Sequence, residues 1–247
     1  MEFYSRDEVI FQLILSKEIG SGSQGTCYLN AITNDVYKIF NQFFYLDIDE
    51  DEKVIYIKDE IMRYSHLIND TFIFPKDVIT LNEEVIGYVT NYVKAIPLNQ
   101  TDPLKVDLNL LVKNIELAHR DIKYLSDHNV STFDMFYNIL YGNKFYVTDT
   151  DEFGYKKNLA SILDYNLSNF SCELYFFLID GYFNEFINQN NILKKMYKEN
   201  DLDILYFIHL FRKSLSEYLG KDINYLSEAS KVLNKRKYYP KYMRFLN

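Results

Sequence analysis

Residues 130–153 read VSTFDMFYNILYGNKFYVTDTDEF, and this stretch decides how we interpret the rest of the chain. Two β-rich runs, 138–141 and 144–148, flank Gly142 and Asn143, a pair that favours a tight turn. The stretch therefore predicts a short β-hairpin that carries several acidic side chains near its open end.

A two-residue turn places Asn138 opposite Val147, so Asn138 and Asp149 should lie beside each other at the open end of the hairpin. A carboxamide oxygen and a carboxylate form a hard oxygen site, which suits magnesium carrying a nucleotide phosphate. Asp134 lies just before the first strand, and Asp151 just after the second. The alternative is a polar loop whose Asp and Asn side chains only cap turns.

The composition limits the class of protein. The chain has 247 residues, 48% of them hydrophobic, so it can bury a full core without disulfides. A net charge of -8 argues against general electrostatic binding of nucleic acid. We find no apolar run long enough for a membrane span and no secretory signal, and the two cysteines fit a reducing cytosol. We therefore expect a cytoplasmic protein.

A glycine-rich segment, 20–25, reads GSGSQG and follows a predicted strand at 11–19. Glycines in this spacing let backbone N–H groups approach phosphate oxygens closely. A dinucleotide-binding fold would need a helix directly after the glycines. Here residues 26–29 favour a second strand and 33–35 a turn. The predicted order is strand, glycine loop, strand, turn, strand.

The third predicted strand, 36–40, places Val36, Lys38 and Phe40 on one face. A lone lysine between apolar neighbours usually extends its amine to water at the edge of a sheet. Beneath a glycine loop, the same geometry would direct the ammonium group toward nucleotide phosphates. Lys38 is therefore a candidate phosphate-binding residue.

An acidic linker, 47–52, precedes a predicted helix whose apolar residues are spaced for one face: Val54, Ile57, Ile61 and Tyr64. Glu60 lies on the flank of that face and could pair with Lys38, which would fix the rotamer of the lysine. Asp59 is a rival for this role, and a solvated helix acid is the alternative for Glu60.

The best domain boundary follows two further strand candidates, 72–80 and 84–92, and leads into the polar linker 99–103. The chain is β-rich before this point and helix-rich after it. We therefore divide it into domains 1–94 and 95–247.

The second domain opens with a predicted helix whose apolar residues recur at helical spacing: Leu111, Ile115, Ala118, Ile122 and Leu125. Within it, residues 119–123 read HRDIK and copy the catalytic-loop letters of protein kinases. That chemistry needs the Asp in a non-helical loop and an Asn five positions later. Asp121 lies inside the helical pattern and Ser126 stands five positions on. We interpret His119, Arg120, Asp121 and Lys123 as ordinary polar-face residues.

The order of the elements nevertheless resembles the protein-kinase-like superfamily over most of the chain. A glycine loop, Lys38 and a helix with Glu60 precede a linker and then Asp134, Asn138 and Asp149. The resemblance implies an α+β, bilobal fold. Its N-terminal lobe would have about five antiparallel strands and one helix, and its C-terminal lobe would be mainly helical.

The resemblance also implies a site for ATP and Mg²⁺. The residues expected at the nucleotide are Gly20, Ser21, Gly22, Ser23, Gln24 and Gly25 of the covering loop, Cys27 and Val36 of the adenine roof, Lys38 and Glu60, and Asn91, Tyr92 and Val93 of the hinge. Asn138, Asp149 and Asp151 would bind the metal, with 149–151 standing where Asp-Phe-Gly is usual. Lys38 and Asp134 would be catalytic, with Asp134 as the base that orients the accepting hydroxyl.

The chain departs from the family pattern around Asp134. Asp134 precedes Asn138 by four positions instead of the usual five, and Phe133 stands at the usual distance. Either a shortened loop still lets Asp134 reach, or Asp151 takes its role, or the base is lost and the protein is a pseudokinase. Nothing after Asp149 reads Ala-Pro-Glu, and the chain enters a predicted helix within about ten residues. The peptide-docking activation segment is therefore missing or rudimentary.

The implied activity is that of an atypical, bacterial-type kinase that transfers the ATP γ-phosphoryl group to a hydroxyl. A protein Ser/Thr acceptor is slightly favoured over a small-molecule hydroxyl such as a sugar, an aminoglycoside or choline. A nucleotide-binding pseudokinase that acts as a regulator or scaffold is the alternative from another class, and a globular interaction protein is the residual one. The basic and aromatic tail, 231–244, is the one segment suited to nucleic acid or an anionic surface.

Overall fold

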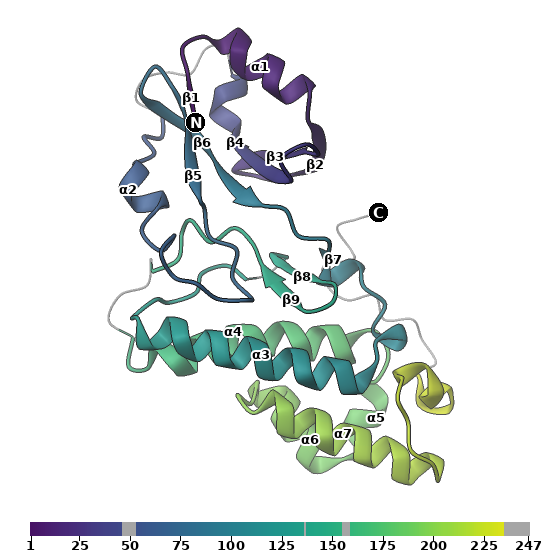
Figure 1. Cartoon of the computed structure of the whole chain (residues 1–247). Helices are drawn as coiled ribbons and strands as arrows, with labels where there is room; N and C mark the ends of the chain where they lie inside the picture. Colours follow the sequence, from purple (N-terminus) through teal and green to yellow (C-terminus); the bar gives the residue numbers. More distant parts are fainter. Residues whose placement is uncertain (46–52, 136, 155–158, 235–247) are drawn as a thin grey trace. The chain divides into compact units, whose positions relative to one another are not determined.

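The structure is a computed structural model that describes residues 1–45, 53–135, 137–154 and 159–234. It is α+β and divides into two compact units (Figure 1). Unit 1 is Met1–Lys94 with Asp149–Glu152, and unit 2 is Ala95–Thr148 with Phe153–Asn247. The segment Asp149–Glu152, which the division drawn from the sequence assigns to the second domain, belongs to unit 1. The acidic linker 47–52 and the tail beyond residue 234 lie outside the described residues.

Unit 1 is built on a six-stranded sheet in the order β1-β5-β6-β4-β3-β2. The strands are β1 (Glu2–Phe3), β2 (Lys17–Ser21), β3 (Gly25–Asn30), β4 (Asp35–Phe40), β5 (Asp77–Leu81) and β6 (Glu84–Asn91). β1 pairs parallel with β5, and all other neighbours pair antiparallel. Strands β2 to β6 correspond to the five predicted strands, and β1 was not predicted.

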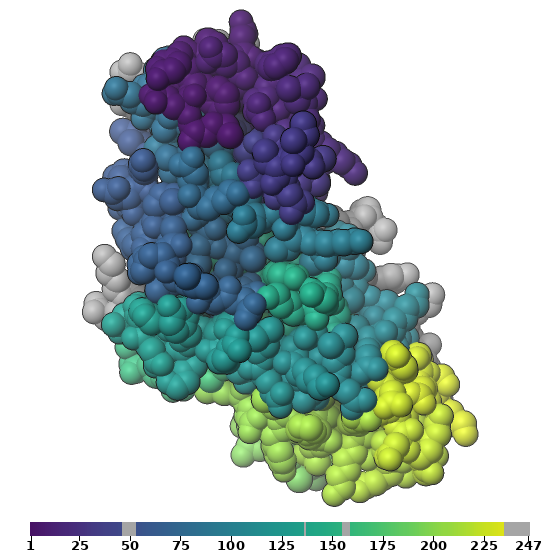
Figure 2. All heavy atoms as spheres, in the orientation of Figure 1, coloured from purple at the N-terminus to yellow at the C-terminus, as the bar shows by residue number. Residues whose placement is uncertain are grey.

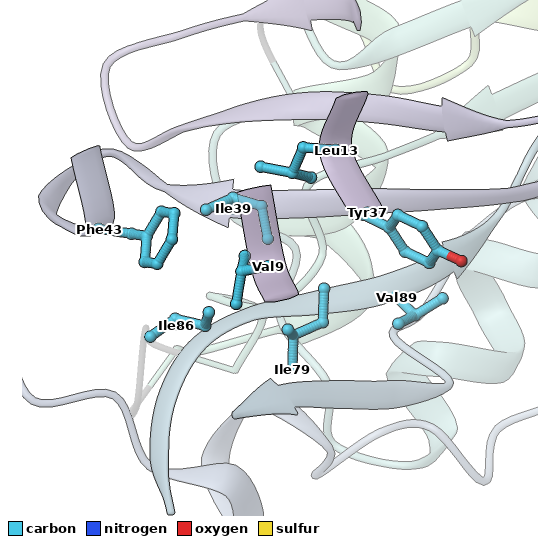
Figure 3. Packing of buried hydrophobic residues seen from close by; sticks show 8 residues of the cluster. All are labelled: Val9, Leu13, Tyr37, Ile39, Phe43, Ile79, Ile86 and Val89. Atoms are coloured by element: carbon cyan, nitrogen blue, oxygen red, sulfur yellow. The ribbon is translucent and has the colours of Figure 1, made fainter. Parts of the chain in front are cut away.

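Helix α1 (Arg6–Ile14) packs on one face of this sheet. Ser5 accepts a hydrogen bond from the Glu8 N–H, and the Glu8 carboxylate accepts one from the Ser5 N–H, which forms a capping box. Val9 and Leu13 lie one turn apart and pack against the sheet (Figure 3). The predicted strand at 11–19 is therefore wrong over its first half, because this cap and apolar stripe start a helix.

The outer face of α1 forms part of the purple surface in Figure 2. Ile10, Phe11 and Ile14 of this helix are exposed, with Ile14 at 74%. The helix therefore buries only the narrow stripe formed by Val9 and Leu13.

The opposite face of the sheet buries Phe40 and Tyr88 with Ile61 of α2 (Lys58–Ile61). The predicted helix over Val54 to Tyr64 is much shorter than expected. Val54 and Ile57 are more than half exposed, so the first half of the expected apolar stripe is not buried, whereas Ile61 is. A 3₁₀ turn, η1 (Asn41–Phe44), follows β4.

Strand β5 begins at Asp77, although we predicted a strand over 72–80. Pro75 lies inside that range and has no N–H group to donate to a neighbouring strand. Phe72 and Phe74 are buried even though they are not in a regular strand.

Unit 2 contains long helices and a small three-stranded sheet in the order β7-β8-β9. Its elements are β7 (Ile96–Pro97), η3 (Leu98–Gln100), η4 (Pro103–Lys105), α3 (Leu108–Asp127), β8 (Ile139–Tyr141), β9 (Phe145–Val147), α4 (Ile162–Tyr175), the π-helix η5 (Phe176–Asp180), α5 (Asn184–Gln189), α6 (Asn191–Glu199), α7 (Ile204–Leu219) and η6 (Leu226–Val232). Helices α3 and α4 lie side by side (Figure 1). No helix among the described residues has the length and apolar character that a membrane crossing needs.

Helix α3 confirms the predicted apolar face, because Leu111, Ile115, Ala118, Ile122 and Leu125 are all fully buried. Residues 119–123 lie inside this helix, as the periodicity predicted. Asp121 is an exception to their expected polar-face position, since it is buried and pairs with Arg120.

The hairpin of β8 and β9 forms as predicted, but its register differs by one residue. Ile139 pairs with Val147 and Tyr141 with Phe145, so the turn contains three residues, 142–144. The Gly142 N–H donates to the Lys144 carbonyl within this turn. Asn138 therefore stands opposite Thr148, whose N–H donates to the Asn138 carbonyl at 3.0 Å. Its predicted pairing with Val147 is wrong.

Candidate functional site

The glycine-rich segment forms the tight connection between β2 and β3. The Gly22 N–H donates to the Gly25 carbonyl at 2.9 Å. The Asn41 side chain donates to the carbonyls of Gly22 and Ser23 from the end of β4. A methyl group on Gly25 would lie 2.6 Å from the Ile39 carbonyl oxygen, whereas one on Gly20 would meet nothing within 4 Å. Gly25 is therefore needed for strand packing, and the backbone at Gly20 is open.

Lys38 lies on β4 directly across from Cys27 of β3. Val36 and Phe40 share its face, while Tyr37 and Ile39 point toward α1. The Lys38 side chain is only 9% exposed, so its amine does not extend freely to water. The predicted strand face is confirmed, and the edge-lysine alternative is not.

The amine of Lys38 binds residues from two distant segments of unit 1. It donates to the Gln24 side-chain oxygen at 3.0 Å and pairs with the Asp149 carboxylate. The Asp151 carboxylate lies 3.6 Å away and is 7% exposed, against 35% for Asp149. Unit 1 thus brings together the glycine loop, Lys38, Asp149 and Asp151, which are far apart in the sequence.

Charge balance explains how this buried cluster is tolerated. Burial opposes the charge on Lys38, but the carboxylates of Asp151 and Asp149 outweigh it and raise the pKa of the lysine. Burial also raises the pKa of Asp151, helped by the nearby Asp149 charge and opposed by Lys38. The Cys27 thiol has its pKa raised to about 11, chiefly by burial, so it stays protonated and unreactive at neutral pH.

Two further side chains complete the cluster. The Tyr88 hydroxyl donates to Asp151 at 2.8 Å and to Asp149 at 3.2 Å. The Gln24 amide group also donates to Glu152, so one loop side chain binds both Lys38 and the 149–152 segment. No local sequence pattern pointed to Tyr88 or Glu152, because the contact of Tyr88 depends on the pairing of β6 with β4 and that of Glu152 on the distant Gln24.

Glu60 does not occupy its predicted position. Its carboxylate is 61% exposed and lies 3.7 Å from Arg63, one turn along. Among the described residues, the carboxylates that pair with Lys38 are those of Asp149 and Asp151. The predicted ion pair between Lys38 and Glu60 is therefore wrong, because the short helix α2 leaves Glu60 in solvent.

The predicted hinge follows β6. Asn91, the last residue of β6, pairs with Asp35. The Tyr92 N–H donates to the Asn34 carbonyl at 3.1 Å, so this group is already used within unit 1. Tyr92 and Val93 are half-buried. Tyr92 therefore cannot offer its N–H to a ligand without losing that bond.

The loop between Asp134 and Asn138 belongs to unit 2 and is described within it. The Asn138 amide group donates to the Asp134 carbonyl at 2.8 Å, and the Asp134 side chain is exposed. Asp134 has a φ of 38° and Tyr137 a φ of 67°, both in a region that non-glycine residues seldom adopt. The structure thus holds the shortened loop in a strained conformation tied by Asn138. Phe133 is half-buried.

Asn166 of α4 fixes the chain just before this loop. Its side-chain oxygen accepts from the Thr132 N–H at 2.7 Å and from the Thr132 hydroxyl at 3.0 Å. Its amide group donates to the Val130 carbonyl and to Ser126 of α3. Asn166 and Thr132 are fully buried. One side chain therefore joins α3, α4 and the segment that leads to Asp134.

Glu173, on the same helix as Asn166, is a second acidic group near Asp134. Its pKa is raised to about 7, first by burial and then by the charge of Asp134. No motif in the sequence pointed to Glu173. The Glu173 carboxyl group therefore has a pKa near neutral pH and lies close enough to Asp134 to be affected by its charge.

The described residues contain no group of three or more His, Cys, Asp or Glu side chains that could hold a metal ion. The sequence matches no protein-family model and no curated protein. The candidate site is therefore interpreted from its own residues.

Proposed function

We propose that this chain is a kinase-like phosphotransferase that binds ATP and transfers its γ-phosphoryl group to a hydroxyl. The observation that carries this proposal is the ion pair between Lys38, beside the glycine loop, and Asp149, 111 positions later. The sequence order alone selected the loop, the lysine and the aspartate for one nucleotide site. Their convergence within unit 1 supports that selection.

The glycine loop and Lys38 would bind the phosphates. The open space around the backbone of Gly20 would let phosphate oxygens approach the loop. The Lys38 ammonium group would offset phosphate charge where little water competes with it. Gln24 bonds to both Lys38 and Glu152, so phosphate binding would replace some of these contacts.

The chemistry of the acidic residues fits magnesium. Of the two carboxylates expected to bind the metal, Asp149 is the accessible hard ligand, with 35% of its side chain exposed, whereas Asp151 is 7% exposed and lies 3.6 Å from the Lys38 amine. Magnesium is commonly held by one or two carboxylates, with waters and substrate phosphates completing its shell. Bound magnesium would supply positive charge to the phosphates. The resemblance also implies Asn138 of unit 2 as a ligand, and the amide nitrogen of Asn138 donates to the Asp134 carbonyl.

Asp134 would orient the accepting hydroxyl. Its carboxylate is exposed, and the bond from Asn138 to its carbonyl holds its backbone. Helix α4 begins at Ile162, so few residues separate it from Asp151. This short connection supports the interpretation that an extended peptide-docking segment is missing. A protein Ser/Thr acceptor remains our first proposal, and a small-molecule hydroxyl is the alternative that the short connection favours.

The test is cleavage of ATP labelled in its γ-phosphate, with magnesium, by the wild type and two lysine variants. Lys38→Met should lower the rate by roughly 100-fold, because it removes charge stabilisation from the phosphates. The matched control is Lys76→Met, since Lys76 is a partly exposed lysine of the same unit that pairs with Asp35. Equal rates in both variants would contradict the proposal.

A nucleotide-binding regulator without transfer is the second candidate. It is favoured by the four-residue spacing between Asp134 and Asn138 and by the strained backbone of that loop. Magnesium-dependent ATP binding without any transferred phosphate would support this candidate over the enzyme.

A further inference from the structure

Tyr88 and Lys38 are direct partners on adjacent strands. They pair across β6 and β4, and the next pair is Gly87 with Ile39. A methyl group on Gly87 would lie 2.1 Å from the Lys38 carbonyl oxygen, so the two strands approach closely here. The Lys38 amine lies 5.2 Å from the centre of the Tyr88 ring, within the range of a cation–π contact. The strand pairing therefore fixes Tyr88 beside the lysine.

The hydroxyl of Tyr88 reaches the same two carboxylates as Lys38. The shorter of its bonds, 2.8 Å, goes to Asp151, and the other, 3.2 Å, goes to Asp149. Tyr88 is buried, and burial together with both carboxylates raises the pKa of its hydroxyl well above the usual value. The hydroxyl therefore stays protonated and acts as a donor.

The two carboxylates differ in exposure. The Asp151 side chain is 7% exposed and is enclosed by Lys38 and Tyr88, whereas Asp149 is 35% exposed. Asp149 also has a φ of 60°, a conformation that costs free energy for a residue with a side chain. Asp149 is therefore the carboxylate with access to a ligand, and Asp151 is the enclosed one.

We propose that Tyr88 and Asp151 are positioning residues that hold Lys38 toward the nucleotide phosphates and perform the task expected of Glu60. In this arrangement Asp151 stays paired with Lys38, and Asp149, the more exposed carboxylate, would be the residue of this pair that holds the metal. This inference rests on the proposed function, because it describes which residues organise the same nucleotide site. It also makes that site independent of α2, where Glu60 pairs with Arg63.

The first test measures magnesium-ATP affinity for four variants. Tyr88→Phe and Asp151→Asn should each weaken binding by roughly tenfold, because the first loses the hydrogen bonds to the two carboxylates and the second loses the charge that pairs with Lys38. Glu60→Gln should leave the affinity unchanged. Tyr37→Phe is the matched control, because Tyr37 is the neighbour of Lys38 on β4 but its hydroxyl lies on the other face of the sheet, where it accepts from Asn30.

A double-variant comparison separates positioning from a structural role. If Tyr88 acts through Lys38, Tyr88→Phe should cost nothing further in affinity once Lys38→Met is present. An undiminished loss in the double variant would overturn the inference, as would a loss in Glu60→Gln that equals the loss in Asp151→Asn.

A second measurement needs no nucleotide, so it can separate the proposed function from the proposed positioning of Lys38. Acetylation of Lys38 by a small acylating reagent, followed by mass spectrometry of the native protein, reports how tightly the amine is held. The rate should rise several-fold in Tyr88→Phe and in Asp151→Asn and stay unchanged in Tyr37→Phe and Glu60→Gln. Wild type that does not bind ATP, with these labelling differences present, would reject the function and retain the positioning. Equal labelling in all variants would overturn the positioning.

Discussion

Two acidic segments of this chain differ in the charged groups that surround them. In unit 1, Asp149 and Asp151 share a buried lysine and a tyrosine hydroxyl. In unit 2, Asp134 has the partly buried Glu173 as an electrostatic neighbour, and the repulsion contributes to the raised pKa of Glu173. A cation within the fold therefore offsets part of the negative charge of the first segment, whereas the second segment has beside it a carboxyl group with a raised pKa. Each difference can be tested by removing one partner.

Lys38→Met should have the largest effect on stability. It leaves Asp149 and Asp151 close together without their cation, one of them almost fully buried. Breaking a buried pair in this way costs about 3 kcal/mol. Urea denaturation should show this loss, and adding Asp151→Asn should restore part of it. A variant as stable as the wild type would mean that the pair is not formed in solution.

Asn166→Ala should be nearly as damaging in unit 2. It leaves the Thr132 N–H and the Val130 carbonyl without their buried partner. The expected loss is about 2 to 3 kcal/mol. Asn169→Ala is the control, since Asn169 makes a longer bond, 3.2 Å, to the Thr132 hydroxyl. Equal losses in the two variants would argue against the central position of Asn166.

Gly87→Ala tests the strand approach that places Tyr88 beside Lys38. The new methyl group would overlap the Lys38 carbonyl and force β4 and β6 apart. Overpacking of this kind costs about 2 kcal/mol. Gly20→Ala should cost less, because its methyl group meets open space. Thermal unfolding of both variants provides the comparison, and similar losses would contradict the close contact.

Glu173→Gln should have the smallest effect, seen only in the pH dependence of stability. The folded pKa of about 7 lies above the ordinary value of 4.5, so the folded state binds more protons between these values. The contribution of Glu173 to stability is therefore present at low pH and is lost as the pH rises toward 7. The variant should lack this decline in urea titrations at pH 5 and pH 7. Parallel pH profiles would contradict the shift.

Local patterns predicted part of the fold. The period of two in β4 placed Lys38 correctly, and helical spacing identified α3. The hairpin register was wrong by one residue, because a three-residue turn formed where Gly142 and Asn143 favoured two. α1 was missed because its signal is the capping box of Ser5 and Glu8, which precedes a short apolar stripe.

The candidate site was predicted less completely, because its contacts join residues that are far apart in the sequence. Lys38, Asp149 and Asp151 were chosen from motif order, but nothing local indicated that Asp151 would pair with Lys38 or that Tyr88 would join them. The pairing of Tyr88 with Lys38 requires β6 to lie beside β4, although β5 separates these two strands in the sequence. Glu60 failed as a partner because α2 has only four residues and exposes it.

The most direct test of the nucleotide site is the thermal shift of the protein with ATP, with and without magnesium. A ligand that binds only the folded state raises its unfolding temperature. We predict a magnesium-dependent increase in the wild type that is lost in Asp149→Asn and kept in Asp127→Asn, where an exposed acid pairs with Lys123. A wild-type protein whose unfolding temperature does not respond to magnesium-ATP would contradict the nucleotide site.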